Sequence, residues 1–163
     1  MGASELSALL WQERELLDLL EYRLEVQRAL LTVGESRWAQ RAADEIEATT
    51  AQLRRLNIAR DIEVQAVADE WQFDAVNPSL RELIAVASAD GPWPEIFTAH
   101  LRAMLASVER IGARRAENGR MLREALRHTQ ETLAGTGDRA GTYTAAGTAD
   151  LGARPAILFE DDA

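Results

Sequence analysis

The sequence of 163 residues contains no cysteine, which excludes a disulfide scaffold, a thiolate metal site and thiol catalysis. Proline and aromatic residues are scarce, at four residues and 6% of the chain, which is typical of a helical protein. Lysine is absent too, so all 18 basic residues are arginine, and 27 acidic residues give a formal net charge of −9. This charge disfavours nucleic acid as a partner, because phosphate backbones are bound by basic surfaces.

Long hydrophobic runs are missing as well. The most apolar stretch, residues 83–89, is seven residues long, whereas a transmembrane helix needs about 20. Glu5 stands where a secretory signal would carry basic charge. We therefore expect a cytoplasmic protein that does not insert into a membrane.

The chain also lacks the usual patterns of catalytic and metal sites. Its two histidines, His100 and His128, are 28 residues apart on one predicted helix, a separation of about 42 Å along the axis. The residues three before them are Phe97 and Ala125, where a di-iron bundle has glutamate. No nucleophile elbow, phosphate-binding loop or dinucleotide fingerprint occurs. We expect no enzyme activity, no catalytic residue, no metal and no cofactor.

What the sequence does contain is helical periodicity in three long segments, at about 4–32, 35–71 and 94–134. Leucine recurs every seventh residue in the first segment, at Leu10, Leu17, Leu24 and Leu31, which is a coiled-coil pattern. Gly34 is expected to end this helix. Thr49 and Arg60 interrupt the apolar spacing of the second segment.

The connector between the second and third segments has its own signals. Ser79 and Glu82 have the spacing of a capping box, which predicts a short helix of about ten residues. Trp71 and Trp93 flank this connector and are expected to close one end of the bundle.

Beyond Gly135 the composition becomes rich in glycine and threonine, which predicts a flexible tail. The resulting fold prediction is all-α. It is an elongated antiparallel helical hairpin or three-long-helix bundle with coiled-coil-like packing and a short connector helix. The helical body would span residues 4–134, and the flexible acidic C-terminal tail residues 135–163.

Three stretches, in this order, resemble flagellar export chaperones of the FlgN family. Residues 9–20 read Leu-Leu-Trp-Gln-Glu-Arg-Glu-Leu-Leu-Asp-Leu-Leu and resemble the family's leucine-rich first helix. Residues 117–126 contain Asn118 and Leu122 in an Asn-x-x-x-Leu spacing similar to the third-helix signature. Residues 142–147, around Tyr143, resemble the element that follows the last helix. The resemblance covers roughly residues 5–147.

The resemblance implies a cytoplasmic chaperone of flagellar type III secretion. Such a protein binds hook-associated (hook–filament junction) proteins before export and delivers them to the export apparatus. An amphipathic surface of the body would accept a client helix. The resemblance places cargo binding on the C-terminal part of the third helix and a contact with the export gate at Tyr143. The implied cargo-binding residues are Val108, Ile111, Arg115, Asn118, Leu122, Leu126 and Leu133.

Two other interpretations stay open. A coiled-coil adaptor or scaffold without an export client would self-associate through the first-helix leucines, and a homodimer is compatible with either function. A bundle that holds a metal or cofactor would need inward-facing histidine or glutamate clusters, which the sequence does not show. The identity of the client, its stoichiometry, the oligomeric state and the role of the acidic end, residues 156–163, do not follow from the sequence.

Overall fold

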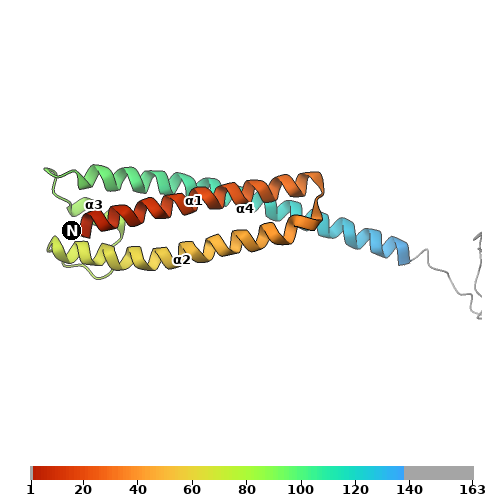
Figure 1. The fold of residues 1–163 in the computed structure, drawn as a ribbon, viewed down its shortest axis with the longest axis horizontal. Coiled ribbons are helices and arrows are strands. Elements are labelled where there is room, and N and C mark those ends of the chain that lie inside the picture. Colours follow the sequence, from red (N-terminus) through yellow and green to blue (C-terminus); the bar gives the residue numbers. More distant parts are fainter. Residues whose placement is uncertain (1, 138–163) are drawn as a thin grey trace, which may run out of the picture. The chain divides into compact units, whose positions relative to one another are not determined.

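The computed structural model describes residues 2–137, and all regular elements in this range are helical. The order is α1 (Gly2–Val33), the 3₁₀-helix η1 (Ser36–Trp38), α2 (Ala39–Glu70), α3 (Leu80–Val86) and α4 (Trp93–Gly137) (Figure 1). The described chain divides into two units, one up to Met121 and one from Leu122 onward. The all-α prediction is confirmed, including the close packing of three long helices.

The helix ends differ from the predicted ends by a few residues. α3 has seven residues instead of about ten, and α4 continues to Gly137, three residues beyond the predicted end. A glycine costs only about 1 kcal/mol in a helix relative to alanine, so Gly135 does not by itself end α4. Residues 138–163, which hold most of the predicted tail and Tyr143, lie outside the described residues.

In the first unit, α2 runs antiparallel to α1 and the first part of α4 runs parallel to it (Figure 1). Residue pairs along the α1–α2 contact show the antiparallel order: Gly2 with Glu70, Glu13 with Arg60, and Arg23 with Thr49. Pairs along the α1–α4 contact show the parallel order: Ser7 with His100, Glu21 with Arg110, and Gln27 with Asn118. The unit is therefore an up–down–up bundle of three helices.

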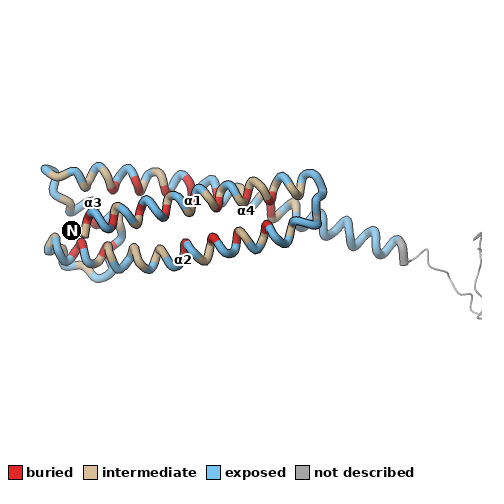
Figure 2. The backbone as a smooth tube through the Cα atoms, viewed as in Figure 1, coloured by how far each residue is buried: buried red, intermediate tan, exposed pale blue. Residues whose placement is uncertain are grey.

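The core of this bundle is built on one face of α1, which we call the inner stripe. Its members recur at alternating steps of four and three residues and are all buried (Figure 2): Leu6, Leu10, Glu13, Leu17, Leu20, Leu24 and Gln27. The other helices contribute buried apolar side chains that include Leu53 and Val64 from α2 and Phe97 and Met104 from α4. The heptad pattern of the sequence therefore corresponds to a real packing seam.

The turn after α1 depends on Gly34, as predicted. Its φ of 73° lies in the left-handed region, which side chains with a Cβ disfavour. The backbone N–H of Glu35 donates to the carbonyl of Leu30 at 3.0 Å, and that of Gly34 donates to Leu31 at 3.3 Å. This pair of bonds is a Schellman motif, so the last carbonyls of α1 are satisfied and the chain reverses into η1 and α2.

The capping box that the sequence predicts at the start of α3 is present. The backbone N–H of Glu82 donates to Ser79 Oγ at 3.2 Å, and the backbone N–H of Ser79 donates to Glu82 Oε2 at 2.8 Å. The Glu82 carboxylate accepts a hydrogen bond from the backbone N–H of Ser79 and another from Ser79 Oγ at 2.7 Å, and these two bonds hold the pKa of the Glu82 carboxyl below its ordinary value. The box satisfies backbone donors that would otherwise lack partners.

The two tryptophans that flank the connector close one end of the bundle. Trp93 stacks on Phe97 with ring centroids 5.5 Å apart, and Trp71 lies on the same ring at 6.3 Å. Phe97 is fully buried, and so is Leu83 of α3. Aromatic contacts of this kind add to the free energy gained by burial, so the connector is an integral part of the core.

We predict that Leu17→Asp and Leu24→Asp each unfold the first unit. Both side chains are buried in the inner stripe, and an unpaired buried carboxylate costs several kcal/mol, a large part of the stability of a typical domain. Circular dichroism should show the loss of helix at 25 °C. The matched control is Tyr22→Asp on the exposed side of the same helix, which should keep the wild-type spectrum. Retained helicity in Leu17→Asp would contradict the assigned core.

Candidate functional site

The residues predicted to contact a client all lie on α4, but the structure places them in two different environments. Ile111 and Asn118 are buried within the first unit, whereas Val108 and Arg115 of that unit are exposed. Leu122, Leu126 and Leu133 are exposed in the second unit. The structure therefore separates the predicted set into packing positions and surface positions.

Asn118 joins α4 to α1 from the inside. Its Nδ2 donates to the carbonyl oxygen of Leu24 and to Oε1 of Gln27, both at 2.9 Å. A buried side chain that makes two such bonds positions one helix against another, because misplacing it would leave polar atoms unpaired. Ile111 belongs to the apolar core of the same unit. Neither side chain offers surface to another protein in this conformation.

Arg115 and Val108 lie on the surface of the first unit. Arg115 Nη2 donates to Thr50 Oγ1 of α2 at 3.3 Å, so this arginine also links α4 to its neighbour. Val108 is exposed, as is Leu105 one turn earlier. These positions are available for a partner without any change in the bundle.

The exposed leucines of α4 form the most extended apolar feature of its last turns. We call Leu122, Leu126 and Leu133 the leucine stripe, since steps of four and seven residues put them on one face of a helix. Leu126 is 63% exposed and Leu133 is 68% exposed. Every residue from Leu122 to Gly135 is exposed (Figure 2).

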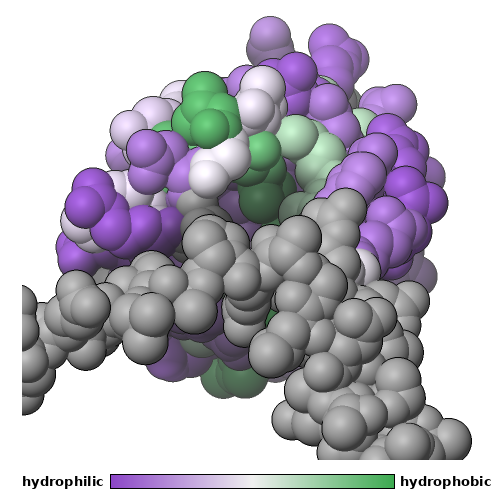
Figure 3. Space-filling model, turned by 90° about the vertical axis from the view of Figure 1, so that its right-hand side faces the viewer, coloured by the Kyte–Doolittle hydropathy of each residue, from purple (hydrophilic) through white to green (hydrophobic). Residues whose placement is uncertain are grey.

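Other large apolar side chains of the described chain are exposed too, such as Trp11 and Val76, but the leucine stripe places three of them on one face of a helix. Seen from the end where α1 meets η1, hydrophilic residues cover most of the surface, and hydrophobic residues are visible between them in more than one place (Figure 3). An apolar stripe that the protein's own helices do not cover is a candidate interaction site. The leucine stripe is therefore the candidate functional site.

Ion pairs join α4 to α1 within the first unit. Arg110 pairs with Glu21 and Arg114 pairs with Glu25, each at 2.9 Å. In the opposite sense, Arg28 of α1 pairs with Glu117 at 2.9 Å, and this hydrogen bond lowers the pKa of the Glu117 carboxyl. Two of the arginines of α4 thus contribute to the packing of the helix on α1.

A family comparison agrees with these features. The model of the FlgN protein family matches residues 1–150. The chain belongs to the FlgN family. No curated protein and no solved structure matches it. Family membership indicates a role as a flagellar export chaperone.

Two further findings concern the described residues of this FlgN-family chain. Within residues 2–137, none of the helices is long and apolar enough to span a membrane. In the same range, no three histidine, aspartate or glutamate side chains are grouped so that they could hold a metal ion.

One buried ion pair was not foreseen from the sequence, in which Arg60 seemed only to interrupt a seam. Arg60 Nη1 of α2 lies 2.7 Å from Glu13 Oε1 of α1, and Glu13 is buried in the inner stripe. Burial raises the pKa of Glu13, and the charge of Arg60 opposes this rise. A glutamate and an arginine that both interrupt apolar seams on neighbouring predicted helices are the signal that could have suggested the pair.

His100 is another buried polar residue of this FlgN-family bundle. Its ring meets the edge of Trp11 at 5.0 Å between centroids, and its Nε2 lies 3.5 Å from Ser7 Oγ. Nδ1 has no hydrogen-bond partner among the described residues. Burial, and then the nearby charge of Arg14, lower the pKa of His100.

We predict that this histidine makes the bundle sensitive to mild acid. The unfolded chain takes up the proton near the ordinary pKa of about 6.5, while the folded chain takes it up only at lower pH. Stability is therefore full above pH 6.5 and decreases as the pH falls below it. Because one proton is involved, the free energy of unfolding decreases by at most about 1.4 kcal/mol per pH unit.

Thermal unfolding at pH 7.5 and 5.5 measures this effect. The loss of Tm between the two values should be smaller in His100→Gln than in the wild type, because the carboxylates are common to both. His128→Gln is the matched control, since His128 is exposed, and it should lose as much Tm as the wild type. An equal loss in all three proteins would contradict the role of His100.

Proposed function

We propose that this protein is a cytoplasmic flagellar type III export chaperone that binds hook-associated proteins and delivers them to the export apparatus. Membership of the FlgN family supports the chaperone role. The observation that carries the proposal of a binding site is the leucine stripe, an apolar face that the described helices leave exposed.

The chemistry of the stripe favours an amphipathic helix as its ligand. Leu122, Leu126 and Leu133 present side chains at helical spacing, which is the arrangement that packs against the apolar stripe of a second helix. Fully burying one leucine contributes about 1.5–3 kcal/mol. Three leucines can therefore contribute several kcal/mol to the binding of a client helix, which offsets part of the free-energy cost of association.

The predicted cargo-binding residues would then have different roles in binding a client. Those of the leucine stripe contact the client directly, and the exposed Val108 and Arg115 extend the surface of the first unit that a client can reach. Ile111 and Asn118 act indirectly, because they hold α4 in the bundle.

We predict that Leu126→Asp weakens client binding about tenfold or more, which corresponds to about 1.4 kcal/mol, without unfolding the protein. The new carboxylate would be desolvated against the apolar face of the client, whereas in the free protein it stays in water. Calorimetric titration with a purified hook-associated protein measures the affinity, and circular dichroism checks the fold.

The matched control is His128→Asp, which places the same carboxylate on the opposite face of the same turns of α4. It should bind the client as the wild type does. Equal loss of affinity in both variants would mean that charge or helix stability, rather than the leucine stripe, determines binding. Wild-type affinity in Leu126→Asp would remove the stripe from the site.

Delivery is proposed to use Tyr143, which lies outside the described residues. One aromatic side chain can supply much of the free energy of a small interface. We predict that Tyr143→Ala folds and binds client normally but lowers the amount of hook-associated protein secreted by cells that carry it. Tyr143→Phe keeps the ring and should restore most secretion. Normal secretion with Tyr143→Ala would remove the delivery role, and lost client affinity would place Tyr143 in the client site.

A further inference from the structure

α1 carries a second apolar stripe beside the buried one. Its members recur at alternating steps of three and four residues, and we call them the outer stripe: Leu9, Gln12, Leu16, Leu19, Arg23, Val26 and Leu30. Five of the seven are large apolar residues, and each of these five is only partly buried. A helix with two such stripes can pack on both sides. In the described chain the core is formed on the inner stripe, and Leu16 of the outer stripe packs against that core.

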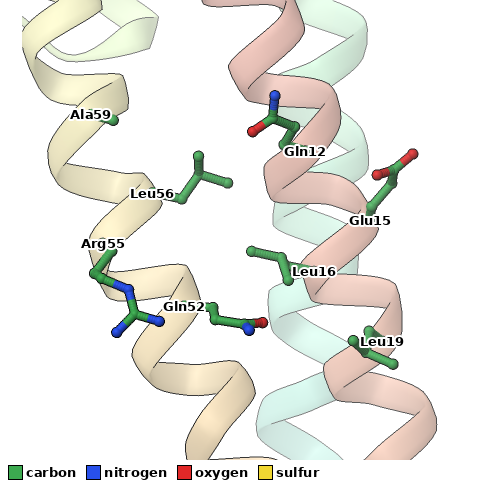
Figure 4. A pocket seen from close by; sticks show the side chains of 8 residues that line it. All are labelled: Gln12, Glu15, Leu16, Leu19, Gln52, Arg55, Leu56 and Ala59. Carbon is green, nitrogen blue, oxygen red and sulfur yellow. The ribbon is translucent and has the colours of Figure 1, made fainter.

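The outer stripe forms one wall of a groove between α1 and α2. The groove has a volume of about 590 Å³, and Leu16 and Leu56 point toward each other across it (Figure 4). On α2 the exposed Ile62, at 66% exposure, lies on the same side of the helix as the groove residue Arg55. Together these residues make an open apolar face over α1 and α2.

Charges of opposite sign stand on the two sides of this face. Glu15 lines the groove from α1 and Arg55 lines it from α2 (Figure 4). Neither Glu15 nor Arg55 forms an ion pair with another residue of the range 2–137. The groove thus has one acidic side chain on α1 and one basic side chain on α2.

Glu15 and Arg55 also lie at nearly the same level of the bundle. Glu13 meets Arg60 and Arg23 meets Thr49 across the antiparallel α1–α2 contact. Interpolating between these two contacts puts Arg55 level with residues 17 and 18 of α1, which is less than one helical turn from Glu15. The acidic and basic groups are therefore side by side at mid-length of the groove.

We infer that a second copy of this chain docks on the open face of α1 and α2. A two-fold axis parallel to the helices puts α1 of one copy over α2 of the other and keeps every residue at its own level. Glu15 of each copy then faces Arg55 of its partner, and the two outer stripes close a common core. The product is a four-helix bundle in which neighbouring helices are antiparallel.

The arrangement of Glu15 on α1 and Arg55 on α2 favours a second copy of the chain over another ligand. An isologous interface must be complementary to itself, and a face with acid on one helix and base at the same level on the other meets that condition. The inference does not depend on the proposed chaperone function, because the leucine stripe belongs to the second unit and takes no part in this face.

Sedimentation equilibrium of the full chain tests the inference. We expect a wild-type dimer, and we expect Glu15→Arg and Arg55→Glu each to raise its Kd at least about tenfold, because the two-fold axis doubles the effect of one reversed charge. The double variant, Glu15→Arg with Arg55→Glu, restores every pair with the signs exchanged. It should return the Kd close to the wild-type value.

Matched controls reverse exposed charges on α4 of the same unit. Glu109→Arg and Arg102→Glu should leave the Kd unchanged, and Leu126→Asp should do so as well. A wild-type chain that stays monomeric up to about 1 mM overturns the inference, and a monomer that takes a client helix in this groove is one form of that outcome. A dimer that the Glu15 and Arg55 reversals do not weaken also overturns it.

Cross-linking gives a second measurement that does not depend on affinity. The chain has no cysteine, so one Glu15→Cys chain and one Arg55→Cys chain can be mixed under mild oxidation. In the inferred arrangement, a disulfide forms between a Glu15→Cys chain and an Arg55→Cys chain in preference to a disulfide between two identical variants. A product dominated by like pairs, or a yield no higher than that of a Glu109→Cys and Arg102→Cys mixture, would contradict it.

Discussion

The burial of the inner stripe of α1 is the interaction on which the first unit depends. α2 and α4 both pack on α1, and the leucines of the stripe lie at their common contact. An apolar seam at heptad spacing can bury leucine continuously only if its neighbours run nearly parallel or antiparallel to it. The direction of all three long helices therefore follows from this one seam. The connector with α3 reverses the chain between the end of α2 and the start of α4.

Polar groups inside this seam determine how the helices are placed along one another. Leucines alone would tolerate a shift by one heptad, since each step looks much like the next. Glu13 with Arg60, and Asn118 with the carbonyl of Leu24, tie particular levels of α2 and α4 to α1. A shift would leave these buried groups without partners, at a cost of about 1–3 kcal/mol for each group. The polar members thus give the bundle its register, and the apolar members give it stability.

The same helices leave apolar surface in two separate places. The leucine stripe of α4 and the open face of α1 and α2 each repeat apolar side chains along a helix, unlike single surface leucines. A chaperone must hold a client and release it again, so an exposed helical face of modest area is better suited to it than a deep cavity.

The sequence by itself determined the helices and the turns between them, because their signals are local. Heptad leucines, Gly34 and the Ser79–Glu82 box each act within a few residues, and each appears in the structure as predicted. Tertiary structure alone decided which α4 residues are covered. Ile111, Asn118 and Leu126 share one helical period, yet the first two are buried and the third is exposed. A period defines a face of a helix, but only a neighbouring helix determines how far along that face burial extends.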